Sequence, residues 1–534
     1  MKRLALALII LLAASLRLYK LGQVPPSLDW DEASLGYNAF AILKTAHDEH
    51  GIFMPLTNFA AFGDYKPPGY IYATVPFIAI FGLSEFAVRF PSAFFGILTV
   101  FITYLLAKKL FENETIALLS ALFLAISPWH LQFSRGAFEA NLGLFFSSLG
   151  IYLFLKFASG SKYWIFASLL SFLAAMYTFT GQRLFVPFIL IVLALNFKNQ
   201  IIKNFKVVAI AGILLLFLFK PLFVFATQTI EGRLRFNEVT IFKDLDPSNE
   251  SIRYRQMDNN VWWTQIVHNR RLFYIREYLI HYFDAFNTGF LFTRGDGNPR
   301  LSIQEVGELY YLDLIFILAG IYFLFATKYK YRWLILGWLL VSPLGPAMAR
   351  ETPHALRMIH ILPTFQLLSA FGAYSLFKKI KFKKTFIFLT SSLLVLNFFY
   401  YLHMYYLHWP LNYSNAWQYG YKQAVEVVKP LYPNYDHIIV TRGLGRPYIY
   451  FLLYNQTDPR EYLKTAKIET DQFFFIDVKG YDKYLFVDNL SQTEVSGRIL
   501  YVANAGQLPS SAQKITTINN LSGSPVFDIG GASR

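Results

Sequence analysis

Long uninterrupted apolar runs constrain the fold of this 534-residue chain more than any other feature. Most of them approach the roughly 20 residues that a helix needs to cross a bilayer. Only 16% of the residues are charged, whereas a soluble protein carries about 25%. The twelve runs are residues 4–18, 69–83, 90–107, 115–131, 139–157, 163–180, 183–197, 207–226, 309–327, 332–349, 357–377 and 385–402. The sequence therefore predicts a polytopic α-helical membrane protein.

Positive charges indicate which of these runs cross the membrane. The run 69–83 is short and contains Pro76, so we interpret it as an interfacial helix in the first outer loop. With that run excluded, six short segments holding 17 Lys and Arg all fall on one side, the cytoplasmic side by the positive-inside rule. We therefore predict eleven transmembrane helices, with the N-terminus cytoplasmic and the C-terminus extracytoplasmic. A cleavable signal peptide is the alternative for residues 4–18.

The same topology explains the net charge of +15, so a nucleic-acid partner is not expected. It divides the chain into a transmembrane domain, residues 1–402, and a small extracytoplasmic α/β domain, residues 403–534. The outer loops of the first domain are about 19–89 and 227–308. In the second domain we expect a helix over 417–428 and strands over 437–441, 472–478 and 499–502. The absence of cysteine excludes disulfides, Cys-ligated zinc and iron–sulfur clusters.

Ionisable residues are nearly absent from the middles of the predicted spans, which disfavours an ion-coupled transporter. They gather instead at the predicted outer ends. Arginines there are unfavoured by the positive-inside rule, so a site for an anion at the outer membrane surface would explain them. The alternative is that each side chain separately reaches the lipid headgroups. These residues are Arg89, Arg135, Glu139, Arg183, Lys220, Asp313, His354, Arg357 and His360.

The first outer loop carries a dense acidic cluster, Asp29, Asp31 and Glu32. Three carboxylates in four residues repel one another unless a cation or a transferred proton offsets their charge. Asp31 and Glu32 point about 100° apart on a helix, so one can act as a base while the other binds or orients. Asp29 and Asp31 could also ligate a divalent cation. The alternative is a solvated acidic turn that caps a helix over 33–44.

Two further segments suggest phosphate binding. Pro67 and Pro68 would hold the ammonium of Lys66 at the start of the interfacial helix. In the segment 350–357, Thr352 and Pro353 are expected to be the N-cap and first residue of a helix. His354 and Arg357 would then share a face near free backbone N–H groups, as in an anion site.

These residues, in this order, resemble the C-type glycosyltransferase superfold, and within it the family 39 protein O-mannosyltransferases and lipid A aminoarabinose transferases. The resemblance covers about residues 17–400. It rests on Arg17-Leu18-Tyr19, Asp31-Glu32-Ala33, Lys66-Pro67-Pro68, the segment 81–86 (FGLSEF) with Arg89 and Pro91-Ser92, and Phe133-Ser134-Arg135.

The resemblance implies a polyprenyl-phosphate-linked sugar as donor, used on the outer face of the membrane with inversion at the anomeric carbon. The acceptor would be a protein, a glycan or a lipid. Asp31 resembles the base or acceptor-orienting residue, Glu32 its partner, and Lys66 the lysine near the donor phosphate. We add Arg135, His354 and Arg357 as phosphate contacts, and Glu139 and Arg89 as further candidates. No cofactor is expected to be required, although related oligosaccharyltransferases use a divalent metal, which Asp29 and Asp31 would hold here.

Two other functions fit a polytopic chain: a lipid or glycolipid transporter, and a receptor whose C-terminal domain binds the partner. The outer loop 227–308 is rich in Arg and contains Trp262 and Trp263. We expect it to help bind acceptor or donor, because Arg pairs with phosphate. An interfacial helix that uses Trp and Arg as membrane anchors is the alternative.

Overall fold

The computed structural model describes the chain except residues 1, 472–475, 491–494 and 534, and it describes no side chains for residues 234–236. The described chain forms two compact units. The first comprises Met1–Arg17, Phe94–Ser134 and Glu139–Tyr401, and the second comprises Leu18–Ala93, Arg135–Phe138 and Leu402–Arg534. Most of the first predicted outer loop therefore belongs to the same unit as the C-terminal domain.

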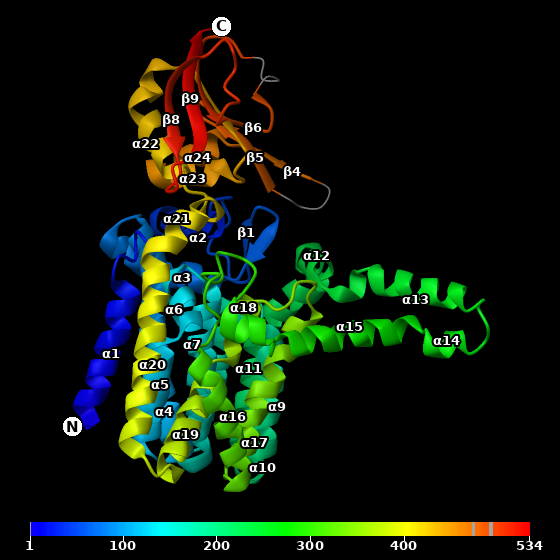
Figure 1. The fold of residues 1–534 in the computed structure, drawn as a ribbon. Helices are drawn as coiled ribbons and strands as arrows, with labels where there is room; N and C mark the ends of the chain where they lie inside the picture. Colours follow the sequence, from blue (N-terminus) through cyan, green and yellow to red (C-terminus); the bar gives the residue numbers. More distant parts are fainter. Residues whose placement is uncertain (1, 472–475, 491–494, 534) are drawn as a thin grey trace. The chain divides into compact units, whose positions relative to one another are not determined.

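The first unit is a bundle of helices (Figure 1). Its helices are α1 (Lys2–Leu18), α4 (Glu85–Phe111, which begins in the other unit), α5 (Glu114–Ile126), α6 (Pro128–Arg135), α7 (Glu139–Ser159), α8 (Trp164–Thr178), α9 (Gln182–Asn196), α10 (Lys198–Lys203), α11 (Phe205–Gln228), α12 (Ile230–Val239), α13 (Asp246–Met257), α14 (Thr264–Val267), α15 (Arg270–Asp284), α16 (Tyr311–Ala326), α17 (Arg332–Val341), α18 (Ala355–Met358), α19 (Thr364–Lys379) and α20 (Lys383–His403).

Within the described residues, four helical stretches are long and apolar enough to cross a membrane: α4, α7, α11 and Lys383–Trp417. The pair α5 and α6, bent by 56°, is a fifth candidate. Shorter apolar helices include α8, α9 and α16, so eleven crossings stay a prediction. Helix α3 (Pro68–Phe81) has 14 residues, which agrees with the short helix expected over 69–83, while its interfacial position stays a prediction.

Helices α16 and α19 approach closely because glycines face each other at their contact. A Cβ atom on Gly372 would lie 1.9 Å from the carbonyl oxygen of Phe316, and one on Gly320 would lie 2.3 Å from that of Leu368. Small residues allow this backbone approach, which is a common way of packing helices inside a membrane.

The second unit joins two helices of the first loop to a mixed sheet. Helix α2 (Trp30–Thr45) packs against α3 and against α23 of the C-terminal segment. Strands β1 (Phe59–Ala61) and β2 (Asp64–Lys66) form a small hairpin between α2 and α3. The remaining elements are α21 (Trp409–Tyr413), α22 (Tyr421–Leu431), α23 (Pro447–Asn455), α24 (Pro459–Thr465), β3 (His437–Thr441), β4 (Lys467–Thr470), β5 (Ile476–Tyr481), β6 (Tyr484–Val487), β7 (Arg498–Asn504), β8 (Gln513–Asn519) and β9 (Pro525–Ser533).

The seven-stranded sheet has the order β4-β5-β6-β3-β7-β9-β8, with β3 parallel to both of its neighbours. Two expected strands are confirmed as β3 and β7. Of the expected strand 472–478, the first four residues lie outside the described residues and the rest begins β5. The expected helix 417–428 begins late, at Tyr421, because Gln418 is left-handed and Gly420 has φ +126°.

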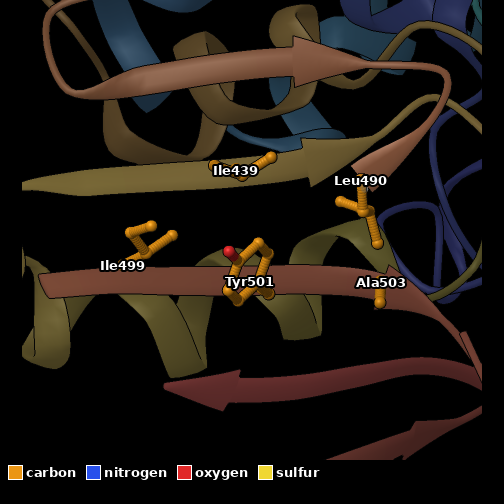
Figure 2. Close-up of a cluster of buried hydrophobic side chains, with 5 residues drawn as sticks. All are labelled: Ile439, Leu490, Ile499, Tyr501 and Ala503. Atoms are coloured by element: carbon orange, nitrogen blue, oxygen red, sulfur yellow. The ribbon is translucent and has the colours of Figure 1, made fainter. Parts of the chain in front are cut away.

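Side chains that alternate along the strands form a buried core on one face of the sheet. Ile499, Tyr501 and Ala503 are two residues apart on β7, so they point to one face, and Ile439 lies opposite Tyr501 on β3. Figure 2 shows these four with Leu490, and all five are buried. This regular core makes the C-terminal segment a folded α/β structure, as expected.

Candidate functional site

The acidic cluster marks the start of α2, with Asp29 as its N-cap. Asp29 Oδ1 accepts a hydrogen bond from the backbone N–H of Glu32 at 2.8 Å, and Glu32 Oε2 accepts one from the N–H of Asp29 at 3.2 Å. This reciprocal pair satisfies two helix-terminal donors. The capping alternative is therefore confirmed for Asp29, but the turn is not solvated, because Asp29 and Glu32 are only 3% and 2% exposed.

Glu32 forms a buried ion pair with Arg89. Nε and Nη2 of Arg89 donate to the two carboxylate oxygens of Glu32 at 2.9 and 2.8 Å. The backbone N–H of Ala137 donates to Glu32 Oε1 at 2.7 Å. With the bond from Asp29, these contacts engage both oxygens of Glu32. Glu32 is thus an internal anchor of this unit.

Two arginines also hold the irregular segment that precedes α2. Arg89 donates to the carbonyl oxygens of Leu21, Pro25 and Ser27. Arg135 donates to the carbonyl oxygens of Tyr19 and Val24 at 2.8 and 3.0 Å, and to the hydroxyl of Tyr405 at 3.1 Å. Both guanidinium groups are buried. Buried backbone carbonyls need such donors where regular structure does not supply them.

Asp31 has a different environment from its two acidic neighbours. Its side chain is 36% exposed and pairs with Lys66, with 3.0 Å between Oδ1 and Nζ. Lys66 Nζ also lies 3.0 Å from Asp64 Oδ2. Two carboxylates therefore share one ammonium, and the three groups carry a net negative charge. The site combines an accessible carboxylate with a cation that is only 12% exposed.

The hairpin and the prolines set the position of Lys66. Lys66 ends β2 and pairs in register with Phe59 of β1. Pro67 is the N-cap of α3 and Pro68 its first residue, so Lys66 comes directly before the helix, as expected. Proline fixes φ near −65°, so the chain turns from strand to helix at a defined angle. Asp64 and Lys66 are two apart on a strand and so share a face.

Glu49, in the loop after α2, is another buried carboxyl group that contacts this helix. Glu49 is fully buried, and its Oε1 accepts a hydrogen bond from Asn38 Nδ2 at 3.0 Å and one from Ser34 Oγ at 3.4 Å. The backbone N–H of Glu49 donates to Asn38 Oδ1 at 3.0 Å. Burial, with a smaller contribution from the charge of Asp48, raises the pKa of Glu49 to about 8. Glu49 therefore ties the loop after α2 to that helix mainly as a neutral acid at neutral pH.

The expectation that Thr352 caps a helix whose first residue is Pro353 is wrong. Thr352 is not an N-cap: its hydroxyl donates to Asp284 Oδ2 at 2.8 Å, and the helix begins later, at Ala355, and has only four residues. The backbone N–H of Ala355 donates to Asp296 Oδ2 at 2.6 Å. Arg357 donates to the carbonyl oxygen of Glu351. A carboxylate of the chain itself thus occupies the helix start where an external anion was expected.

Titration in this segment follows from burial. Burial, and next the charge of Arg357, lowers the pKa of His354 to about 3, so the imidazole is neutral at physiological pH. Burial raises the pKa of Asp296. Glu308, whose Oε1 accepts from the N–H of Asp296 at 3.1 Å, has its pKa raised well above the usual range by burial and then by Asp296. His354 therefore offers an anion no positive charge.

The predicted site residues divide between the two units. Asp29, Asp31, Glu32, Lys66, Arg89 and Arg135 belong to the second, whereas Glu139, His354 and Arg357 belong to the first. Sequence reasoning missed the roles of Asp64, Ala137 and Asp296. The spacing of Asp64 and Lys66 on a strand was the available signal for the first. Ala137 and Asp296 form hydrogen bonds with residues more than 50 positions away in the sequence.

A divalent metal would need several converging oxygen or nitrogen ligands among the described residues. Among them, no group of three or more His, Asp or Glu side chains is arranged to hold a metal ion. Asp29 Oδ1 is engaged by the backbone of Glu32, as described above. A divalent metal at Asp29 and Asp31 stays a prediction.

Comparisons with known proteins connect this geometry to a fold. The family model described as "Dolichyl-phosphate-mannose-protein mannosyltransferase" matches residues 65–225. The structure of ArnT from Cupriavidus metallidurans in the apo state aligns over 98% of this chain and 97% of ArnT, with a TM-score of 0.56 and 11% identity. The chain has the C-type glycosyltransferase fold. The chain therefore shares its fold with ArnT, and several of its described helices are long and apolar enough to cross a membrane.

Other similar proteins are a second ArnT structure, an archaeal enzyme and a bacterial protein with a short matching segment. The same ArnT bound to undecaprenyl phosphate aligns with a TM-score of 0.56 and 10% identity, over 98% of this chain and 97% of that one. The archaeal oligosaccharyltransferase AglB from Archaeoglobus fulgidus aligns with a TM-score of 0.49 and 14% identity, over 85% of this chain but only 63% of AglB. An uncharacterized protein of Aquifex aeolicus is 33% identical over 101 residues, which are 19% of this chain and 20% of that protein.

Proposed function

We propose that this chain transfers a sugar from a polyprenyl-phosphate-linked donor to an acceptor on the outer face of the membrane, and that Asp31 is its catalytic base or acceptor-orienting residue. The acceptor would be a protein, a glycan or a lipid. The single observation that carries the proposal is the contrast within the acidic cluster. Asp31 is 36% exposed beside Lys66, while Asp29 and Glu32 are buried in a fixed network.

The proposed reaction is one displacement. The Asp31 carboxylate takes the proton of the acceptor hydroxyl as that oxygen bonds to the anomeric carbon. The bond from this carbon to the phosphate oxygen breaks, and its electron pair leaves with the lipid phosphate. Attack opposite the leaving group inverts the anomeric configuration. Glu32 and Arg89 hold the start of α2, so that Asp31 keeps its direction.

Lys66 would couple donor binding to this step. In the structure its ammonium pairs with Asp31 and Asp64, 3.0 Å from an oxygen of each. A donor phosphate that binds Lys66 would compete with Asp31, and so would free the carboxylate for the acceptor. The ammonium would also stabilise the charge that grows on the leaving phosphate.

The test uses purified protein with a radiolabelled polyprenyl-phosphate hexose and a membrane extract as acceptor. Loss of general-base catalysis should lower consumption of the donor about 10²–10⁴-fold in Asp31→Asn. The thermal unfolding midpoint should change little, because Asp31 is partly exposed. The matched control is Asp64→Asn, which removes the other carboxylate on Lys66 and should retain most activity. Full activity in Asp31→Asn with each donor of a sugar panel contradicts the proposal.

Two further measurements address metal dependence and the transporter alternative. Added chelator should leave consumption unchanged; a loss would instead make Asp29 and Asp31 metal ligands. Flux of lipid across sealed vesicles without a covalent product would favour a transporter.

We further propose the topology of eleven spans with a cytoplasmic N-terminus. It is supported by the single-sided distribution of the Lys and Arg segments. Because the chain has no cysteine, single cysteines at Ser161 and Ser510 can be labelled from either side of sealed membranes. Only Ser510→Cys should react with an impermeant reagent added from the outer face.

A further inference from the structure

The outer loop 227–308 contains a helical hairpin that we call the arm, residues 246–284, formed by α13, α14 and α15. Figure 1 shows α13 and α15 running side by side away from the other helices of the bundle, close to α12. Ser251 donates to the carbonyl oxygen of His268, and Arg276 pairs with Glu250 between the two long helices. The rings of Tyr254 and Phe273 stack, with centroids 5.9 Å apart. The arm therefore has its own internal packing.

The arm is attached at an end of the apolar bundle. The hydroxyl of Tyr282 donates to the carbonyl oxygen of Leu340 at 2.8 Å, and that of Tyr278 to Leu344 at 3.0 Å. Leu340 is next to the last residue of α17, an apolar helix. These bonds tie α15 to the C-terminal end of α17 and to the turn that follows it.

One face of α15 is apolar and exposed. Leu272, Ile275, Leu279 and Phe283 follow the spacing i, i+3, i+7 and i+11, so they share a side of the helix. Their exposed fractions are 48, 53, 46 and 64%. Phe273, which faces α13, is buried by contrast. The apolar face is thus turned away from the arm's own packing.

The turn between the helices extends this apolar surface. Trp262 is 76% exposed, and Ile266 and Val267 are 63 and 55% exposed. Residues 251–275 contain four arginines (Arg253, Arg255, Arg270 and Arg271) and one acidic residue, Asp258. The outer part of the arm is therefore both apolar and positively charged. Trp and Arg beside an amphipathic helix are typical of segments that lie in a membrane interface.

We propose that the arm lies on the bilayer that the chain spans, with the apolar face of α15 and the Trp262 turn at the boundary of headgroups and acyl chains. The arginines of its outer part bind the phosphates of anionic phospholipids. A charged, half-polar hairpin of this kind cannot cross the hydrocarbon region, but it can rest on it. This inference does not depend on the sugar-transfer proposal.

The test uses the full-length protein in lipid nanodiscs and exploits its lack of cysteine. An environment-sensitive fluorophore is attached to Leu279→Cys or, as an aqueous control, to Ser510→Cys in the exposed loop after β7. A lipid carrying a nitroxide high on its acyl chain should quench the label at 279 several-fold more than aqueous iodide does. The order should be reversed at 510. Stronger quenching by iodide at both positions overturns the proposal.

A second measurement separates lipid from protein binding. Lipid quenching at 279 should fall when phosphatidylglycerol is replaced by phosphatidylcholine, and also when Arg270→Glu and Arg271→Glu are combined. An unchanged thermal unfolding midpoint of the double variant would show that the chain still folds. A label that is open to iodide until a protein extract is added identifies a protein partner and overturns the lipid proposal.

Discussion

The start of α2 and the segment 350–357 both gather charged residues in predicted outer segments of the chain, yet their accessible carboxylates have different surroundings. At α2, the carboxylate of Glu32 accepts hydrogen bonds from Arg89 and from backbone N–H groups, while the side chain of Asp31 stays 36% exposed. Near α18, the carboxylate of Asp296 accepts a hydrogen bond from the backbone N–H of Ala355, and burial keeps the imidazole of His354 neutral. Both clusters leave a carboxylate accessible, but Asp31 lies beside the nearly buried ammonium of Lys66, whereas Glu351 of the second cluster is 78% exposed.

Arg89→Met should give the largest effect, because it breaks the buried pair on which the α2 cluster rests. Removing one partner leaves the Glu32 charge uncompensated, which typically costs about 3–5 kcal/mol. The unfolding midpoint in chemical denaturant should fall accordingly. Lys66→Met is the control, since Lys66 pairs with the partly exposed Asp31. Equal midpoints for the two variants would contradict an anchoring role for Arg89.

Asp296→Ala should have the next largest effect and would sharpen the contrast with Asp31. The backbone N–H groups of Ala355 and Asn298 lose their acceptor, and an unsatisfied buried donor costs about 1–3 kcal/mol. The same denaturant titration should show a loss of stability for Asp296→Ala and almost none for Asp31→Asn. If Asp31→Asn destabilises as much, Asp31 belongs to the structural network.

Glu49→Gln should have the smallest effect, and one that depends on pH. The pKa of Glu49 is raised to about 8 in the folded protein, so between about pH 4.5 and 8 the unfolded state releases a proton that the folded state keeps. Stability of the wild type should therefore fall with rising pH across this range and level off above it. Thermal unfolding of Glu49→Gln should lack this component, and identical pH profiles would contradict the assignment.

Local patterns account for what the sequence predicted correctly. The cap at Asp29, which the sequence offered as an alternative, the prolines after Lys66 and the strand 437–441 each depend on a few neighbouring residues. The pairs Glu32–Arg89 and Asp296–Ala355 are separated by 57 and 59 positions, so no local pattern could reveal them. The error at Thr352 has the same origin, because its hydroxyl is drawn to Asp284 on another helix.

The hydrogen bonds from Arg89 to the segment before α2 have an evolutionary consequence. The guanidinium contacts carbonyl oxygens of Leu21, Pro25 and Ser27, which are groups that every amino acid carries. Side chains in this segment can therefore change without loss of these bonds, whereas Arg89 cannot. Substitutions near the acidic cluster could thus reshape what approaches Asp31 while Arg89 and Arg135 preserve the path of the chain.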